Sequence, residues 1–193
     1  MTTLSKRHQF VIGCSLVALM VATRGHHFPT MQAMLPSASW AVFFLAGIYL
    51  RALWFPALLM VLAAGLDHIA ISVGEVSPFC ISPAYAALLP AYASLWFAGR
   101  WYQRRCGLTT IAPLPLIASF STGALLCEII SSASFYVFSG LFAAPTFIEF
   151  AERFSRYFPS SLISIALWVG IGTVLHAAQL AARGAPVFTM PKR

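Results

Sequence analysis

One segment of the chain holds a cysteine between two prolines, where a thiol can serve as a ligand to a soft metal. Pro78 and Pro83 flank Phe79 and Cys80, and two prolines so close together exclude a continuous helix. At membrane depth, irregular backbone is tolerated where protein covers it or where it lines a cavity. We therefore expect Cys80 at the edge of a pocket, with its thiolate available to a soft metal. The alternative is that Cys80 is a small apolar filler.

Acidic residues inside apolar segments are a second set of candidates. Asp67, followed by His68, lies within such a segment, and so does Glu128 further along the chain. A charge at membrane depth is costly without a partner, so an intramembrane acid is a candidate binding group. For Asp67 the alternative is a structural ion pair with Arg24, Arg153 or a nearby histidine. For Glu128 the alternative is packing against a polar neighbour.

Two further polar groups lie between apolar segments. His26 and His27 are adjacent, and imidazoles on a loop can bind a metal or hydrogen-bond an amide-rich ligand. Neighbouring imidazoles rarely point the same way, so ordinary interfacial histidines are the alternative. Further on, Glu149 and Arg153 stand at i,i+4 spacing, which a solvated surface helix explains. The functional alternative is a lid that carries Arg153 into a pocket.

The elements that must position these residues are apolar helices. The chain of 193 residues is 60% hydrophobic and 9% charged, with a mean hydropathy of +0.82, well beyond a soluble domain. Each of six segments approaches the roughly 20 residues that a membrane span needs, namely 9–23, 38–51, 52–73, 83–102, 114–138 and 159–182. We expect an all-α integral membrane protein with six transmembrane helices, forming a single domain over residues 1–193.

The short second segment is separated from the third only around Arg51, which predicts a tight helical hairpin, and five spans is the alternative count. The first segment also has the layout of a signal peptide, but no cleavage site follows it, so we expect a retained helix.

The distribution of basic residues predicts the orientation. Three of the 12 Lys and Arg residues fall on one side of the predicted bundle, at Arg24, Arg153 and Arg156. The other side holds Lys6, Arg7, Arg51, Arg100, Arg104, Arg105, Arg183, Lys192 and Arg193. Cytoplasmic loops retain the excess of positive charge, so both termini are expected to be cytoplasmic. That result needs an even number of spans and favours six over five.

Several function classes are disfavoured. The net charge of +7 lies in short clusters between apolar runs, so it indicates topology rather than a nucleic-acid partner. The four cysteines form no C-x-x-C pair, which argues against a zinc site or a disulfide framework. The sequence has no phosphate-binding G-x-x-x-x-G-K-[ST] loop and no H-E-x-x-H or G-x-S-x-G motif. No inverted repeat suggests a secondary transporter.

Taken together, these residues resemble the BtuM cobalamin transporters, relatives of the substrate-binding S-components of energy-coupling factor transporters. The likeness covers nearly the whole chain. Its most specific part runs from Asp67-His68 through residues 77–85 to Pro90-Ala91-Tyr92, supported by residues 24–29. The resemblance implies an S-component-like bundle in the bacterial inner (cytoplasmic) membrane, with cobalamin held at the extracytoplasmic side.

The resemblance also implies the site. The cysteine matching Cys80 would bind the cobalt of cobalamin, with Asp67, Tyr85 and Arg153 as polar neighbours. The wider set of expected binding residues adds His68, His26, His27 and Phe79. No resident cofactor is expected. Thiolate donation to cobalt would also allow an accessory removal of cyanide from cyanocobalamin.

The family resemblance also bears on the partners of the protein and on its alternative functions. Ala18 and Ala22 match the small-residue motif by which S-components meet a shared energising module, although family members also look like solitary transporters. The leading alternative is an S-component for another vitamin or for a metal ion. A membrane thiol oxidoreductase would need paired cysteines, and only Cys80 is expected at the outer face. A structural membrane subunit is the remaining alternative.

Overall fold

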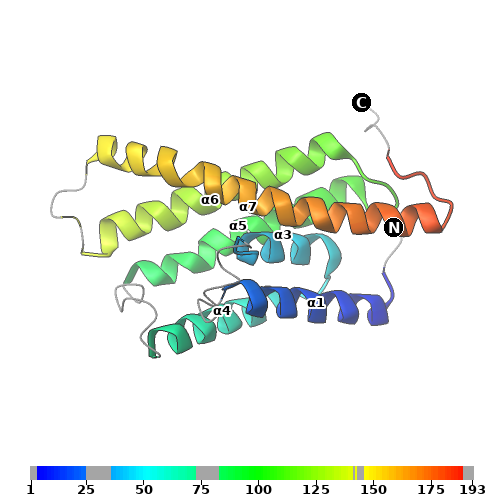
Figure 1. Cartoon of the computed structure of the whole chain (residues 1–193), viewed down its shortest axis with the longest axis horizontal. Helices are drawn as coiled ribbons and strands as arrows, with labels where there is room; N and C mark the ends of the chain where they lie inside the picture. Colours follow the sequence, from blue (N-terminus) through cyan, green and yellow to red (C-terminus); the bar gives the residue numbers. More distant parts are fainter. Residues whose placement is uncertain (1–3, 25–35, 73–82, 141, 143–145, 189–193) are drawn as a thin grey trace.

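The computed structural model describes residues 4–24, 36–72, 83–140, 142 and 146–188. Across these residues the protein is all-α, with six α-helices and one short 3-10 helix, and the one β-bridge joins Ile111 to Phe188. The elements in chain order are α1 (Lys6–Arg24), α3 (Ser39–Tyr49), α4 (Phe55–Ser72), η2 (Pro83–Ala87), α5 (Leu88–Cys106), α6 (Pro113–Phe138) and α7 (Phe147–Ala182). Successive helices run in opposite directions along one bundle (Figure 1).

The described residues form six α-helices, as expected, and three of these helices are long and apolar enough to cross a membrane. Helices α3 and α4 are joined by the expected short connection at Arg51. The predicted start of the last helix is wrong. We expected it at residue 159, but α7 begins at Phe147 and continues through Pro159. Thr146 caps the first turn, since its hydroxyl accepts a hydrogen bond from the backbone N–H of Glu149. The proline removes one backbone hydrogen bond without ending the helix.

Helix α3 lies at the centre of the bundle and contacts each of the other five α-helices. Nine of its 11 residues are buried. A Cβ atom on Gly47 would lie 2.2 Å from the carbonyl oxygen of Trp96, and one on Gly99 would lie 2.1 Å from that of Phe44. These two glycines therefore let the backbones of α3 and α5 touch. With a rise of about 16 Å, α3 covers only half of a hydrocarbon core by itself.

The outer surface of the bundle is apolar. Helices α4, α6 and α7 are long and apolar enough to cross a membrane. On α7 only Ile165, Val169 and Leu180 are buried, while large apolar side chains such as Ile163 and Val174 are more than two-thirds exposed. Apolar surface on this scale is unfavourable in water and suits a lipid environment.

The two ends of the bundle differ in charge. We call one the Arg24 end; there α1, α4 and α6 finish and α3, α5 and α7 begin. The opposite one is the Lys6 end, where the chain both starts α1 and leaves α7 (Figure 1). Described basic residues at the Lys6 end are Lys6, Arg7, Arg51, Arg100, Arg104, Arg105 and Arg183. The acids of the described helices all lie in the half of the bundle near Arg24, at Asp67, Glu128, Glu149 and Glu152.

Candidate functional site

An ion pair stands at the Arg24 end. Arg24 is the last residue of α1, and its Nε and Nη2 donate to Oδ1 and Oδ2 of Asp67 on α4, at 2.8 and 2.7 Å. Two parallel charge-assisted hydrogen bonds fix both side chains in one geometry. The side chains retain only 11% and 24% exposure. Of the partners expected for Asp67, the structure shows Arg24.

Three more side chains extend this pair into the Arg24 network, defined as Arg24, Asp67, Tyr85, Tyr92 and Ser39. The Tyr85 hydroxyl on η2 donates to Oδ2 of Asp67 at 2.8 Å. Nη1 of Arg24 donates to the Tyr92 hydroxyl at 3.0 Å and to Oγ of Ser39 at 3.1 Å. Helices α1, α3, α4 and α5 and the short η2 are thereby joined at one point. The hydrogen bonds hold these charged and polar side chains in fixed positions, and the same groups also suit a polar ligand.

The same end of the bundle holds a cavity of about 240 Å³ between the end of α6, the beginning of α7 and the beginning of α5. We call it the Arg153 cavity. Its lining combines aromatic rings, two serines and one cation, from Leu88, Ser131, Ser132, Phe135, Tyr136, Phe150, Arg153 and Tyr157. The volume is below that of a pocket for a drug-sized ligand. Within the described residues, the cavity has room for one arm of a large ligand.

Arg153 is turned toward the cavity by aromatic rings. Its guanidinium carbon is 4.8 Å from the ring centroid of Phe142 and 5.6 Å from that of Tyr157, within the range of cation–π attraction. Glu149 instead accepts a hydrogen bond from the Tyr136 hydroxyl at 2.6 Å. The exposed positions of Glu149, Glu152 and Arg156 confirm a surface helix there, while the half-buried Arg153 belongs to the cavity.

Glu128 is the most buried of the described acids. Its side chain is 5% exposed, and its Oε1 accepts a hydrogen bond from the hydroxyl of Ser132 at 2.5 Å. Ser132 also lines the Arg153 cavity. The structure thus places Glu128 against a polar neighbour and one hydroxyl group away from the cavity.

The remaining predicted residues divide into two groups. His68 is exposed on α4 and takes no part in the Arg24 network. His26, His27, Phe79 and Cys80 lie outside the described residues. In the described part of the chain no three His, Cys, Asp or Glu side chains gather as a metal site, and its three cysteines, Cys14, Cys106 and Cys127, are free.

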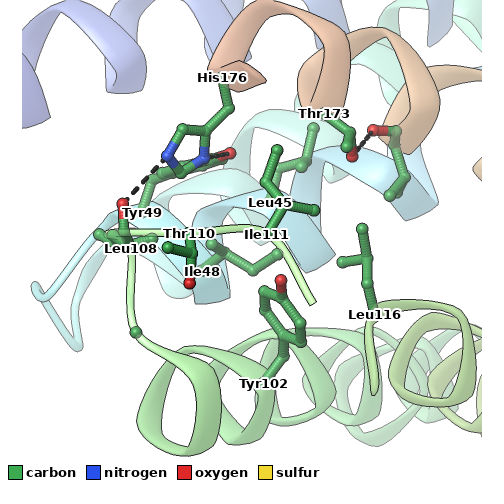
Figure 2. A pocket seen from close by; sticks show the side chains of 12 residues that line it. Leu45, Ile48, Tyr49, Tyr102, Leu108, Thr110, Ile111, Leu116, Thr173 and His176 are labelled. Atoms are coloured by element: carbon green, nitrogen blue, oxygen red, sulfur yellow. Dashed lines mark hydrogen bonds between the residues drawn. The ribbon is translucent and has the colours of Figure 1, made fainter. Parts of the chain in front are cut away.

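The Lys6 end carries a second polar cluster, which the sequence analysis missed (Figure 2). Nδ1 of His176 on α7 is 2.9 Å from the Tyr49 hydroxyl on α3, and Nε2 is 3.1 Å from the carbonyl oxygen of Leu108. Because a carbonyl only accepts, Nε2 carries the proton and Nδ1 accepts from Tyr49. The cavity beside them measures about 10 Å³, room for one water molecule at most. This end is closed.

Comparison with known proteins gives no further information about this site. No protein-family model matches the sequence, and no curated protein matches it.

Proposed function

We propose that this protein is a six-span membrane transporter that binds cobalamin at its Arg24 end, with an S-component-like fold. The observation that carries the proposal is the convergence of the Arg24 network and the Arg153 cavity at one end of the bundle. Tyr85 on η2 belongs to the network and Leu88, three residues later, lines the cavity, so one short segment joins both. Cys80 precedes η2 by only three residues in the sequence.

The orientation in the membrane is supported by charge. The described basic residues gather at the Lys6 end and the described acids in the other half. The positive-inside rule then makes the Lys6 end, with both termini, cytoplasmic. The Arg24 end faces the outside of the inner membrane, the side from which a vitamin arrives.

The polar groups suit the rim of a corrin ring, which carries many amide side chains. Arg153 offers donors toward carbonyl oxygens, and Tyr85 offers a hydroxyl held in place by Asp67. Asp67 positions Arg24 and Tyr85. The thiolate of Cys80 binds cobalt, because sulfur is a good donor to this metal. The proposed contacts also include His68, His26, His27 and Phe79, and Phe79 contributes its aromatic ring.

Two accessory properties belong to the same proposal. When the Cys80 thiolate takes a coordination position on cobalt, cyanide leaves with its electron pair, so the thiolate replaces one ligand by another without a change of redox state. Ala18 and Ala22 are both exposed on α1, which supports their use as a contact for a shared energising module.

The test is the absorption spectrum of the protein purified from medium that contains cobalamin. The wild type should carry a corrinoid whose spectrum shifts on Cys80→Ala, with at least about tenfold weaker binding, since a metal–ligand bond is lost. Cys14→Ala is the matched control, because Cys14 is a free, exposed cysteine on α1. An unchanged spectrum in Cys80→Ala would refute cobalt ligation.

A growth experiment distinguishes cobalamin transport from the alternative, an S-component for another vitamin or for a metal ion. Expression in a cobalamin-requiring strain without its own uptake system should rescue growth on low cobalamin. A purified protein without corrinoid, together with no rescue, would favour the alternative.

A further inference from the structure

Three arginines gather at the Lys6 end, outside both polar clusters described above. Arg51 lies in the connection between α3 and α4, and Arg100 and Arg104 are four residues apart near the end of α5. Arg51 and Arg104 are both close enough to Arg100 to repel its charge. We call these three residues the arginine group. No Asp or Glu of the described residues lies at this end, so the described part of the chain supplies no carboxylate to offset the repulsion.

Arg100 is the member of the group that the bundle holds in place. It is half-buried, and its Nη1 donates to the carbonyl oxygen of Leu50 at 2.9 Å. Its guanidinium carbon lies 5.6 Å from the ring centroid of Trp96, a side chain that is only 6% exposed. Nε of Arg100 and Nε1 of Trp96 are buried, and neither has an acceptor among the described residues. Buried donors generally have a partner, so this site has positive charge and donors to spare.

The surface beside the arginine group is apolar and aromatic. Exposed side chains flank it where α4 begins and along the end of α5, at Leu53, Trp54, Phe97 and Trp101. The guanidinium carbon of Arg105 lies 5.9 Å from the ring centroid of Trp101. Tryptophans on membrane proteins gather at the depth of the lipid headgroups. The arginine group therefore lies where lipid-facing surface meets water, which is the depth of phospholipid phosphates.

We propose that the arginine group binds the headgroup of an anionic phospholipid in the leaflet at the Lys6 end. Guanidinium groups bind phosphate oxygens through parallel charge-assisted hydrogen bonds, and basic pockets between membrane helices on the cytoplasmic side suit such headgroups. The phosphate supplies the missing counter-charge and acceptors, while the acyl chains lie along the exposed apolar side chains of α4 and α5. This partner is separate from cobalamin, and its binding needs the membrane but not the transport function.

Native mass spectrometry of the full chain in detergent tests the proposal. The protein is titrated with phosphatidylglycerol, and with phosphatidylcholine that has the same acyl chains but a zwitterionic headgroup. Phosphatidylglycerol should bind at least about tenfold more tightly, because each arginine near an anionic headgroup adds to the attraction. Inorganic phosphate in large excess should not displace it, since the free ion makes no contact with the apolar surface. Equal binding of the two lipids, or displacement by phosphate, would overturn the lipid site.

Substitutions locate the site. Arg51→Gln and Arg104→Gln should each weaken phosphatidylglycerol binding at least about tenfold, because a charge-assisted hydrogen bond is lost, and should leave phosphatidylcholine binding unchanged. Arg104→Lys keeps the charge and should retain most of the binding. Arg183→Gln is the control at the same end, since Arg183 is exposed and lies near His176 on α7. It should bind both lipids as the wild type does.

The control separates a site from diffuse surface charge. An equal loss in Arg183→Gln and Arg104→Gln would mean that any arginine at this end attracts the lipid, and would overturn the site. Arg51 and Arg104 are both exposed, so the variants should melt as the wild type does without added lipid. If one does not fold, the wild-type preference for phosphatidylglycerol and Arg104→Lys decide. Protein that binds phosphatidylglycerol selectively but no cobalamin overturns the transport function alone.

Discussion

The two ends of the bundle hold polar clusters of different character. At the Arg24 end a partly buried ion pair belongs to a network of side chains from five elements, and the same end holds a cavity of about 240 Å³. At the Lys6 end the Tyr49–His176–Leu108 cluster is neutral, ties three segments together and leaves a cavity of about 10 Å³. The first cluster contains an ion pair and shares its end with a cavity, while the second cluster is uncharged and leaves almost no free volume between its residues.

Under the proposed function, this difference corresponds to separate tasks for the two ends. Buried ion pairs contribute little net stability, and their geometry fixes side chains in place. Hydrogen bonds between uncharged groups cost less free energy to bury, so they can join helices without burying a charge. We therefore expect disruption of the Arg24 end to impair ligand binding, and disruption of the Lys6 end to affect stability alone.

The largest effect is expected where one change disturbs both ends. Helices α3 and α5 run between the clusters, and Gly99 allows their close contact. In Gly99→Ala the new Cβ would lie 2.1 Å from the carbonyl oxygen of Phe44 and 3.2 Å from the backbone nitrogen of Ile48. Both of these atoms belong to the backbone, which cannot move aside as a flexible side chain could. We therefore expect the free energy of unfolding to fall by about 3 kcal/mol or more.

Thermal melting in detergent measures this effect. The control is Gly65→Ala on α4, where nothing lies within 4 Å of a new Cβ and alanine favours the helix by up to about 1 kcal/mol. Equal melting temperatures for the two variants would contradict the close packing of α3 against α5.

A smaller effect, confined to one end, is expected from Asp67→Asn. The variant keeps the shape of the side chain but leaves the Arg24 guanidinium without its counter-charge. A loss of about 2–3 kcal/mol is expected, below the range for fully buried pairs because Asp67 retains 24% exposure. Cobalamin binding should weaken in parallel, because the amide keeps only one acceptor oxygen, for which Tyr85 must compete with Arg24. Melting temperature and a binding titration measure the two effects.

A double variant tests whether the pair is the cause. Arg24→Gln combined with Asp67→Asn should lose less stability than the sum of the single changes, because neither leaves the other charge unpaired. Additive losses would mean that the two side chains act independently.

The elements were predictable from the sequence, because apolar runs of this length have few other folds in a membrane. The start of α7 was not predicted, because the apolar segment begins at residue 159 while the helix begins at Phe147, next to its cap Thr146. The partner of Asp67 was among the three kinds expected, but only the packing of α1 against α4 selects Arg24. Sequence spacing could not choose between them.

The rest of both clusters depends on tertiary packing. Ser39 and Tyr92 join the Arg24 network because α3 and α5 start at the same end as α1 finishes. Tyr49 and His176 are 127 positions apart, and neither stands in a motif. An intramembrane histidine was the available signal, since polar groups at membrane depth generally have a partner or a role.

The smallest effect is expected from Tyr49→Phe at the Lys6 end. The change removes the hydroxyl that donates to Nδ1 of His176 and leaves an uncharged ring in the same place. We expect a loss of about 1 kcal/mol, the usual net value of a neutral hydrogen bond, with cobalamin binding unchanged. Melting temperature and a binding titration in the same detergent measure both quantities. If Tyr49→Phe weakened cobalamin binding as much as Asp67→Asn does, the two ends would be coupled, and ligand binding would depend on closure of the Lys6 end.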